Sequence, residues 1–173
     1  MRWLPFQLNP DLPESGIPRE EYVARKFGAR GKGVNERVTL AGRQVGIPFA
    51  YEKMKVQPNT LNAHRLMLYA ERAGKQDPLA EELFRAHFTE GANLTDREAL
   101  ADVAARAGLD RKAVLDYLAG DTDRDQVARA DVEARSAGIG GVPFFIFNRK
   151  VSVSGAQDPE MLLDAMEQAL SEG

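Results

Sequence analysis

The sequence predicts an α/β protein whose elements run in the order short strand, long helical stretch, β-hairpin and final helix. Three observations predict this order. An apolar run opens the chain, and helix-capping residues with helically spaced apolar residues fill positions 59–137. The run FFIF at residues 144–147 is followed by the alternating run VSVS at residues 151–154, which is typical of two paired strands.

The N-terminal third is expected to hold the first strand and two helices. Residues 2–8 are rich in large apolar side chains and predict a short strand. Residues 9–16 contain several turn-forming residues and predict an irregular segment. Helices are then expected over residues 19–28 and 33–45, where apolar residues recur at helical spacing and Gly28 and Pro48 stop the pattern.

From residue 59 to residue 137 the sequence predicts one helix after another. Each begins at a recognisable capping residue, and most end at a glycine. Thr95 and Glu98 have the spacing of a capping box, and Pro78 after Asp77 is typical of a first helical turn. The expected caps are Asn59, Asp77, Thr95 and Asp110, with a further polar helix over residues 123–137.

The pattern changes at Gly138, where a glycine-rich segment leads to the predicted hairpin. We expect strands at 144–147 and 150–154, a turn at Asn148 and Arg149, and a last helix that begins at Pro159. Pro143 stands at the entrance of the first of these strands, and proline is tolerated there mainly at edges or special turns. A cis bond would hold the preceding backbone outward for a ligand, whereas a trans proline would only stiffen the strand entry.

Composition limits the function classes. The 173 residues fit one domain, or one domain with a large insertion, and 23 basic against 26 acidic residues give a net charge of −3. The lack of a basic excess argues against nucleic-acid binding. We also expect no membrane-spanning helix, because no window approaches 18 uninterrupted apolar residues. A secretory leader is not recognised either, so the expectation is a cytoplasmic protein.

The chain contains no cysteine. It therefore offers no thiolate for disulfide exchange or for zinc. The two histidines, His64 and His87, lie far apart in sequence without a metal-binding spacing, and packing roles are expected for them. We expect neither a cofactor nor a metal, and no catalytic residue can be assigned within this sequence.

The run GGVPFFIFNRKVSVSGAQDPEMLLDAMEQAL resembles the C-terminal part of DsbA-like thioredoxin-fold proteins, specifically the FrnE branch. RWLPFQLNPDLPESG resembles the second strand and following loop of that family, EEYVARKFG its next helix, and PNTLNAHR an element of its inserted helical domain. The resemblance implies a thioredoxin-like fold of the DsbA type with a large helical insertion. Residues 1–12 and 123–173 would form the thioredoxin-like domain and residues 13–122 the inserted domain.

The resemblance also implies a substrate site. Val142 and cis-Pro143 would form one wall of a groove, in which the Val142 backbone pairs with a substrate peptide or with the cysteinyl part of glutathione. Phe144 would begin the strand beneath this groove, and simple core packing is the alternative role for it. The partners implied are an extended peptide or a glutathione-like thiol.

The sequence departs from the family at its opening. Family members begin with a strand, a Cys-x-x-Cys motif and a helix, and we expect that this unit is missing from an incomplete sequence. The chain as given should then be redox-inactive. Two alternatives stay open: a glutathione-dependent isomerase or transferase of the kappa-like branch, and a non-catalytic peptide-binding protein or homodimer that completes its sheet between chains.

Overall fold

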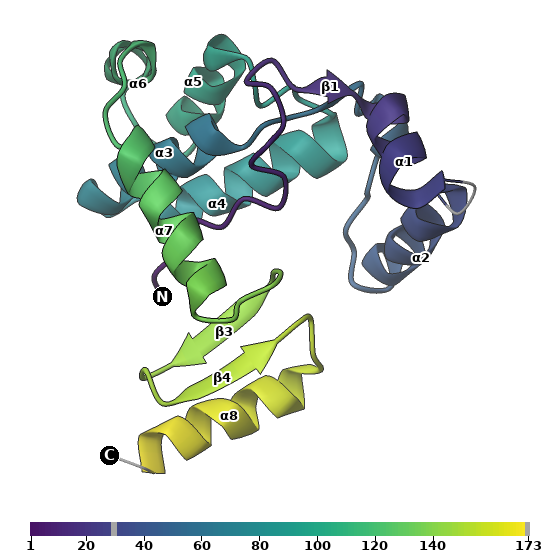
Figure 1. Ribbon diagram of the computed structural model, residues 1–173, viewed down its shortest axis with the longest axis vertical. Coiled ribbons are helices and arrows are strands. Elements are labelled where there is room, and N and C mark those ends of the chain that lie inside the picture. Colours follow the sequence, from purple (N-terminus) through teal and green to yellow (C-terminus); the bar gives the residue numbers. More distant parts are fainter. Residues whose placement is uncertain (29–30, 172–173) are drawn as a thin grey trace. The chain divides into compact units, whose positions relative to one another are not determined.

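The computed structural model describes residues 1–28 and 31–171, and the chain divides into two compact units (Figure 1). Met1–Val127 form the first, here called the helical unit, and Ala128–Gly173 the second, here called the hairpin unit. The expected domain boundaries at residues 12 and 123 are a different division and stay a prediction. None of the helices in the described ranges is long and apolar enough to cross a bilayer.

The secondary structure is mainly helical, with four short strands in the described residues. The helical unit contains β1 (Ile17–Pro18), α1 (Arg19–Phe27), α2 (Gly31–Gln44), the 3-10 turn η2 (Tyr51–Lys53), β2 (Val56–Gln57), α3 (Leu61–Arg72), α4 (Gln76–Arg85), the π-helical turn η3 (Ala86–Glu90), α5 (Arg97–Arg106) and α6 (Arg111–Ala119). Helix α7 (Arg124–Ser136) begins in the helical unit and continues into the hairpin unit, which also contains β3 (Phe144–Phe147), β4 (Val151–Ser154) and α8 (Pro159–Ser171).

The core of the helical unit lies among α3, α4, α5 and α6. Their apolar residues recur at helical spacing, so each helix turns one apolar face inward. Burial is complete at the centre, where four leucines have no exposed surface: Leu66, Leu79, Leu100 and Leu118. The helices predicted over this stretch are therefore confirmed. Two of the predicted caps are wrong. Helix α4 begins at Gln76 after Lys75, before the expected cap Asp77. Asp96 rather than Thr95 is the cap of α5 and accepts a hydrogen bond from the Glu98 amide at 2.9 Å.

The strand predicted over residues 2–8 is wrong. These residues carry no strand, and the Trp3 backbone instead pairs with the side-chain amide of Gln76. The Trp3 amide donates to Gln76 Oε1 at 2.9 Å, and Gln76 Nε2 donates to the Trp3 carbonyl at 3.0 Å. No described strand lies beside this segment, so a side chain satisfies the backbone groups that a sheet would otherwise pair.

Two-residue strands β1 and β2 pair antiparallel and tie the start of α1 to the segment before α3. Gly16 precedes β1 with φ of 70°, and a Cβ placed there would lie 2.5 Å from the Gln57 carbonyl oxygen. Only glycine fits this close approach and this left-handed backbone. Residues 9–15 before it are irregular, in agreement with the prediction from their composition.

Arg65 is fully buried and fixes the segment that follows α6. Its guanidinium donates to the Thr122, Tyr117 and Gly120 carbonyls at 2.8, 3.1 and 2.5 Å. These carbonyls belong to the end of a helix and the turn after it, and they have no partner within the helix. A charged side chain from α3 therefore caps α6 and positions the chain where it enters α7.

Asp123 also stabilises the segment between α6 and α7. Its Oδ2 accepts hydrogen bonds from Arg72 Nη2 and from the Tyr117 hydroxyl, both at 2.7 Å. Burial alone would raise the pKa of Asp123, but the hydrogen bonds from Arg72 and Tyr117 outweigh it and hold the pKa below its usual value. Burial, together with the hydrogen bond to Asp123, raises the pKa of Tyr117 to about 12. A network of hydrogen bonds around buried Arg65 and half-buried Asp123 thus holds residues 120–124.

In the hairpin unit, β3 and β4 pair antiparallel with Phe147 opposite Val151, and α8 packs against the pair. Both strands and the final helix confirm the prediction, but the turn is longer than expected. Residues 148–150 form it, because Lys150 donates its amide to the Phe147 carbonyl at 3.0 Å and does not join β4. Asn148 and Arg149 both adopt positive φ, and Asn148 Nδ2 donates to the Ala169 carbonyl of α8 at 3.2 Å.

Candidate functional site

The loop between α7 and β3 contains the residues expected to bind substrate. Helix α7 ends with Gly138 at φ of 85°, and the Ile139 amide donates back to the Ala134 carbonyl at 3.0 Å. This geometry closes the helix and turns the chain toward β3. The peptide bond between Val142 and Pro143 is cis.

The register of the hairpin brings the SGAQ run, residues 154–157, beside Pro143. Phe144 lies opposite Ser154, so the next residue, Gly155, reaches Pro143 and donates its amide to the Pro143 carbonyl at 2.8 Å. Gln157 Nε2 donates to the Ser154 carbonyl at 2.9 Å and closes the loop after β4. Two runs that are separate in sequence therefore form one structure, in which the second supports the first.

Val142 is exposed to solvent. Its residue surface is 47% exposed, and within the described residues neither its amide nor its carbonyl has a hydrogen-bonding partner. The adjoining strand β3 pairs only with β4 in the described part of the chain, so its other edge is open. An exposed strand edge and a free amide next to it are the features to which an extended polypeptide can add as a further strand.

Phe144 lies on the open face of the hairpin. Side chains alternate along a strand, so Phe144 and Ile146 share one face, while Phe145 and Phe147 share the other and stack with ring centroids 6.3 Å apart. A cavity of about 230 Å³ lies beside Phe144 and Ile146. Arg149 and Lys150 also line it, so the cavity combines an apolar floor with positive charge.

The other polar residues considered from the sequence do not join this loop. His87 is 8% exposed in η3, where its ring contacts Phe88 and its Nδ1 lies 3.4 Å from the Ala92 carbonyl. Burial lowers the pKa of His87 below its ordinary value. His64 lies on α3, and within the described ranges no three His, Asp or Glu residues are grouped to hold a metal ion. The chain holds no cysteine, so thiolate chemistry has no donor here.

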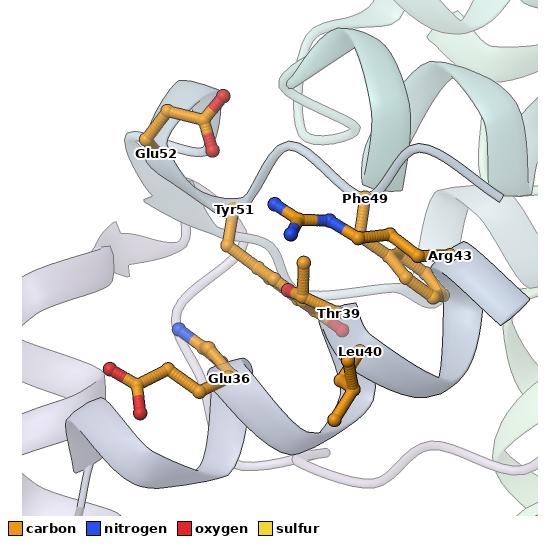
Figure 2. Close-up of a pocket in the computed structure, with 8 residues that line it drawn as sticks. Glu36, Thr39, Leu40, Arg43, Phe49, Tyr51 and Glu52 are labelled. Carbon is orange, nitrogen blue, oxygen red and sulfur yellow. The ribbon is translucent and has the colours of Figure 1, made fainter.

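Two features of the molecule were missed in the sequence. The Gly155 amide donates a hydrogen bond to the Pro143 carbonyl. The only sequence signal for this contact is the position of Gly155 in a glycine-containing run directly after a predicted strand. A second cavity, of about 640 Å³, lies beside α2 and is lined in part by Phe49 and Tyr51 (Figure 2). Neither ring belongs to a periodic pattern, since Phe49 lies in an irregular segment after a proline and Tyr51 begins the three-residue turn η2, so spacing could not reveal them.

Comparison with known proteins identifies a family and similar solved structures. The family described as DSBA-like thioredoxin domain matches residues 1–167. The crystal structure of a probable DsbA oxidoreductase from Streptomyces coelicolor superposes with a TM-score of 0.88 at 28% sequence identity, and the match covers 97% of this chain and 74% of that chain. A search of curated proteins finds no match.

These matches confirm the expected fold: the chain has a DsbA-like thioredoxin fold, rich in helix and with few short strands. The family match spans almost the whole chain, and the structural match is equally extensive. The chain therefore belongs to the DSBA-like thioredoxin domain family, that of the DsbA-like thiol-disulfide oxidoreductases.

Proposed function

We propose that this chain is the substrate-binding part of a DsbA-like thiol-disulfide oxidoreductase of the FrnE branch. Val142, Pro143 and Phe144 would hold an extended polypeptide or a glutathione-like thiol, and the reacting cysteine pair would come from outside these 173 residues. The observation that carries the proposal is at Val142, an exposed residue whose backbone has no hydrogen-bonding partner among the described residues and which adjoins the open edge of β3.

The binding step follows from backbone chemistry. A substrate that runs antiparallel to the loop would accept a hydrogen bond from the Val142 amide and donate one to its carbonyl. Each such bond contributes about 0.5–1.5 kcal/mol, so the backbone contacts orient the substrate and side-chain contacts add the rest. Phe144 and Ile146 beside the 230 Å³ cavity would receive an apolar side chain of the substrate.

The chemical step needs a thiolate that this chain does not have. In thiol-disulfide exchange a thiolate attacks one sulfur of the substrate disulfide, and the other sulfur leaves as a thiolate. No hydroxyl, imidazole or amine in this chain can replace that group in a redox exchange. The lack of cysteine also favours a second candidate, a non-catalytic protein that uses the same loop only to bind peptides.

The binding role is tested by nuclear magnetic resonance with the 15N-labelled chain and a cysteine-free extended peptide, and separately with S-methylglutathione. We expect the largest shift changes at the Val142 amide and along β3. N-methylation of the peptide amide that faces Val142 should weaken binding about two- to ten-fold, the value of one hydrogen bond. A peptide that binds without moving the Val142 resonance would contradict the proposal.

The catalytic role is tested by the intact mass of the endogenous protein with and without a thiol-alkylating reagent. A mass above 19.1 kDa with alkyl adducts would support the oxidoreductase. A larger mass without adducts would favour the kappa-like glutathione enzyme, which uses serine. A mass of 19.1 kDa would leave the non-catalytic peptide-binding protein.

A further inference from the structure

Helix α8 of the hairpin unit carries a row of apolar side chains that are exposed in the described structure. Leu163, Met166 and Leu170 have 56%, 46% and 73% of their surface exposed. They follow one another at spacings of three and four residues, so they lie along one face of the helix. Apolar side chains with this spacing are normally buried, and their exposure indicates a surface to which another molecule binds.

This row is not the face by which α8 packs on its own unit. The helix lies beside β4 (Figure 1) and contacts both strands of the hairpin, and its buried residues are Ala165 and Ala169. The two alanines are four residues apart and form a second face, next to the row of Leu163, Met166 and Leu170. The three larger side chains therefore remain largely open to a partner.

The same helix carries an excess of negative charge. It has no lysine or arginine, and residues 172–173, which follow it, bring no positive charge. Four carboxylates on α8 or directly before it are exposed and form no ion pair within the described residues: Asp158, Glu160, Asp164 and Glu167. Carboxylates on α5 differ in this respect, since Glu98 and Asp102 both pair with Arg111. The negative charges of α8 are therefore available to a partner.

The two basic residues of the hairpin turn do not cancel this charge. Arg149 and Lys150 follow Asn148, which donates to the Ala169 carbonyl, so this turn adjoins the C-terminal end of α8. The four carboxylates lie before that end, from residue 158 to residue 167, and none of them is within ion-pair distance of the turn. The excess of negative charge along the helix therefore stands.

The charges lie beside the apolar row in the arrangement of a coiled coil. With Leu163 and Leu170 as a positions and Met166 as a d position, Glu160 and Glu167 both fall on e positions. Residues at e positions border the apolar seam of a coiled coil and pair with charges of the facing helix. The apolar row of α8 therefore has an acidic border along one side.

A facing helix with basic residues complements this border. A second copy of α8 does not, because in an antiparallel pair Glu160 and Glu167 would face the same residues of the other copy and repel them. An extended polypeptide does not match either, since its side chains alternate and do not follow a spacing of three and four residues.

We propose that this face of α8 binds an amphipathic helix of a partner protein. The apolar side chains of the partner helix pack on Leu163, Met166 and Leu170. Its lysine or arginine side chains pair with Glu160 and Glu167. The contact involves no thiol and no residue of the Val142 loop, so it can fail or succeed independently of the function proposed above.

The test is a titration of the full 15N-labelled chain with a synthetic helical peptide about two heptads long, which has leucine at its a and d positions and lysine at its e and g positions. Repulsion between the lysines keeps the peptide from pairing with itself. We expect the largest shift changes at residues 160–170. The same peptide with glutamate in place of lysine should bind at least about ten-fold more weakly, and added salt should weaken binding of the lysine peptide.

The decisive variants change the acidic border and the apolar row separately. Glu160→Gln and Glu167→Gln should each weaken binding of the lysine peptide about two- to five-fold, the value of one exposed ion pair. Leu163→Ala together with Met166→Ala should weaken it at least about ten-fold, because two apolar contacts are lost. All four residues are exposed, so circular dichroism should show an unchanged fold. Glu133→Gln, which removes an exposed carboxylate of α7, is the matched control and should leave the affinity unchanged.

Three results would overturn the proposal. The first is a double variant with Glu160→Gln and Glu167→Gln that binds the lysine peptide as tightly as the wild type. The second is a set of shift changes that maps outside α8. The third is a chain that is dimeric by analytical ultracentrifugation and becomes monomeric when Leu163 and Met166 are replaced, which would make this face a contact between two copies of the chain.

Discussion

The helical unit and the hairpin unit differ in how they bury apolar surface. The helical unit surrounds four completely buried leucines with a continuous apolar cluster. In the hairpin unit the buried apolar side chains of the described residues are Ala165 and Ala169, both small. Several large apolar side chains of that unit are instead exposed: Val132, Val142, Ile146, Met161, Leu163, Met166 and Leu170.

This difference indicates that the helical unit supplies most of the stability and that the hairpin unit supplies the surface for binding. Burial of a large side chain contributes about 1.5–3 kcal/mol, so the leucine core must supply most of the folding free energy. The hairpin unit instead displays the backbone and the apolar side chains that a partner can contact. Open edges and exposed apolar residues are costly in an isolated domain and are typical of surfaces that bind.

The largest expected effect comes from the residue that joins α3 to the segment after α6. Arg65→Ala should lower the free energy of unfolding by about 3–5 kcal/mol, because it leaves a cavity and deprives the Gly120, Tyr117 and Thr122 carbonyls of their donor. Urea unfolding followed by circular dichroism measures this loss.

Arg85→Ala is the control for that experiment. Arg85 is an exposed arginine of α4 that pairs with Glu82 and Glu90, and its loss should lower the free energy of unfolding far less than the loss of Arg65, because solvent screens an exposed ion pair. Equal decreases in the free energy of unfolding for the two variants would show that Arg65 does not stabilise the segment between α6 and α7.

The second prediction compares the units directly by removing a large aliphatic side chain from each. Leu100→Ala, in the core of the helical unit, should cost about 2–5 kcal/mol because the site is fully buried. Ile146→Ala, on the open face of β3, should cost less than about 1 kcal/mol because Ile146 is already 52% exposed. Urea unfolding of both variants measures the difference, and a larger loss for Ile146→Ala would reverse the comparison.

The same contrast explains what the sequence could predict. Helices α3 to α6 have apolar periodicity and caps such as Asp110, which accepts the Ala113 amide at 2.7 Å, so their existence followed from local pattern. The FFIF and VSVS runs likewise predicted β3 and β4 with their correct pairing partners. The site loop was located through its resemblance to a family, because a Val-Pro pair alone says little.

Long-range contacts were beyond local pattern. The apolar residues 2–8 have the composition of a strand, but a strand forms only where a neighbouring strand can pair with it. Here the Gln76 side chain forms hydrogen bonds with the Trp3 backbone instead. The α2 cavity depends on Phe49 lying against Gly42, a contact between an irregular segment and a helix. Neither contact produces a repeating pattern of apolar residues, so neither could be predicted from the sequence.

The last prediction concerns the pH dependence of the free energy of unfolding and the role of Asp123, which lies directly before α7. Asp123 has a lowered pKa in the folded state because Arg72 and Tyr117 donate to its carboxylate against the effect of burial. A carboxyl whose pKa is lowered by folding stabilises the protein above its unfolded pKa, near 3.8, and this stabilisation is lost as the pH falls through the folded pKa. At neutral pH the contribution should be on the order of 1–2 kcal/mol.

Asp123→Asn isolates this contribution. Asparagine tolerates the φ of 65° at this position and keeps the shape of the side chain, so the variant removes the charge with little backbone strain. The difference in unfolding free energy between wild type and variant should be largest at pH 7 and should shrink below about pH 4, while all other carboxyls cancel in the subtraction. A difference that is constant down to pH 3 would mean that the charge of Asp123 contributes nothing and that Arg65 alone fixes the segment before α7. In that case the segment between α6 and α7 would be held by the hydrogen bonds from the buried Arg65 guanidinium to the Thr122 and Gly120 carbonyls.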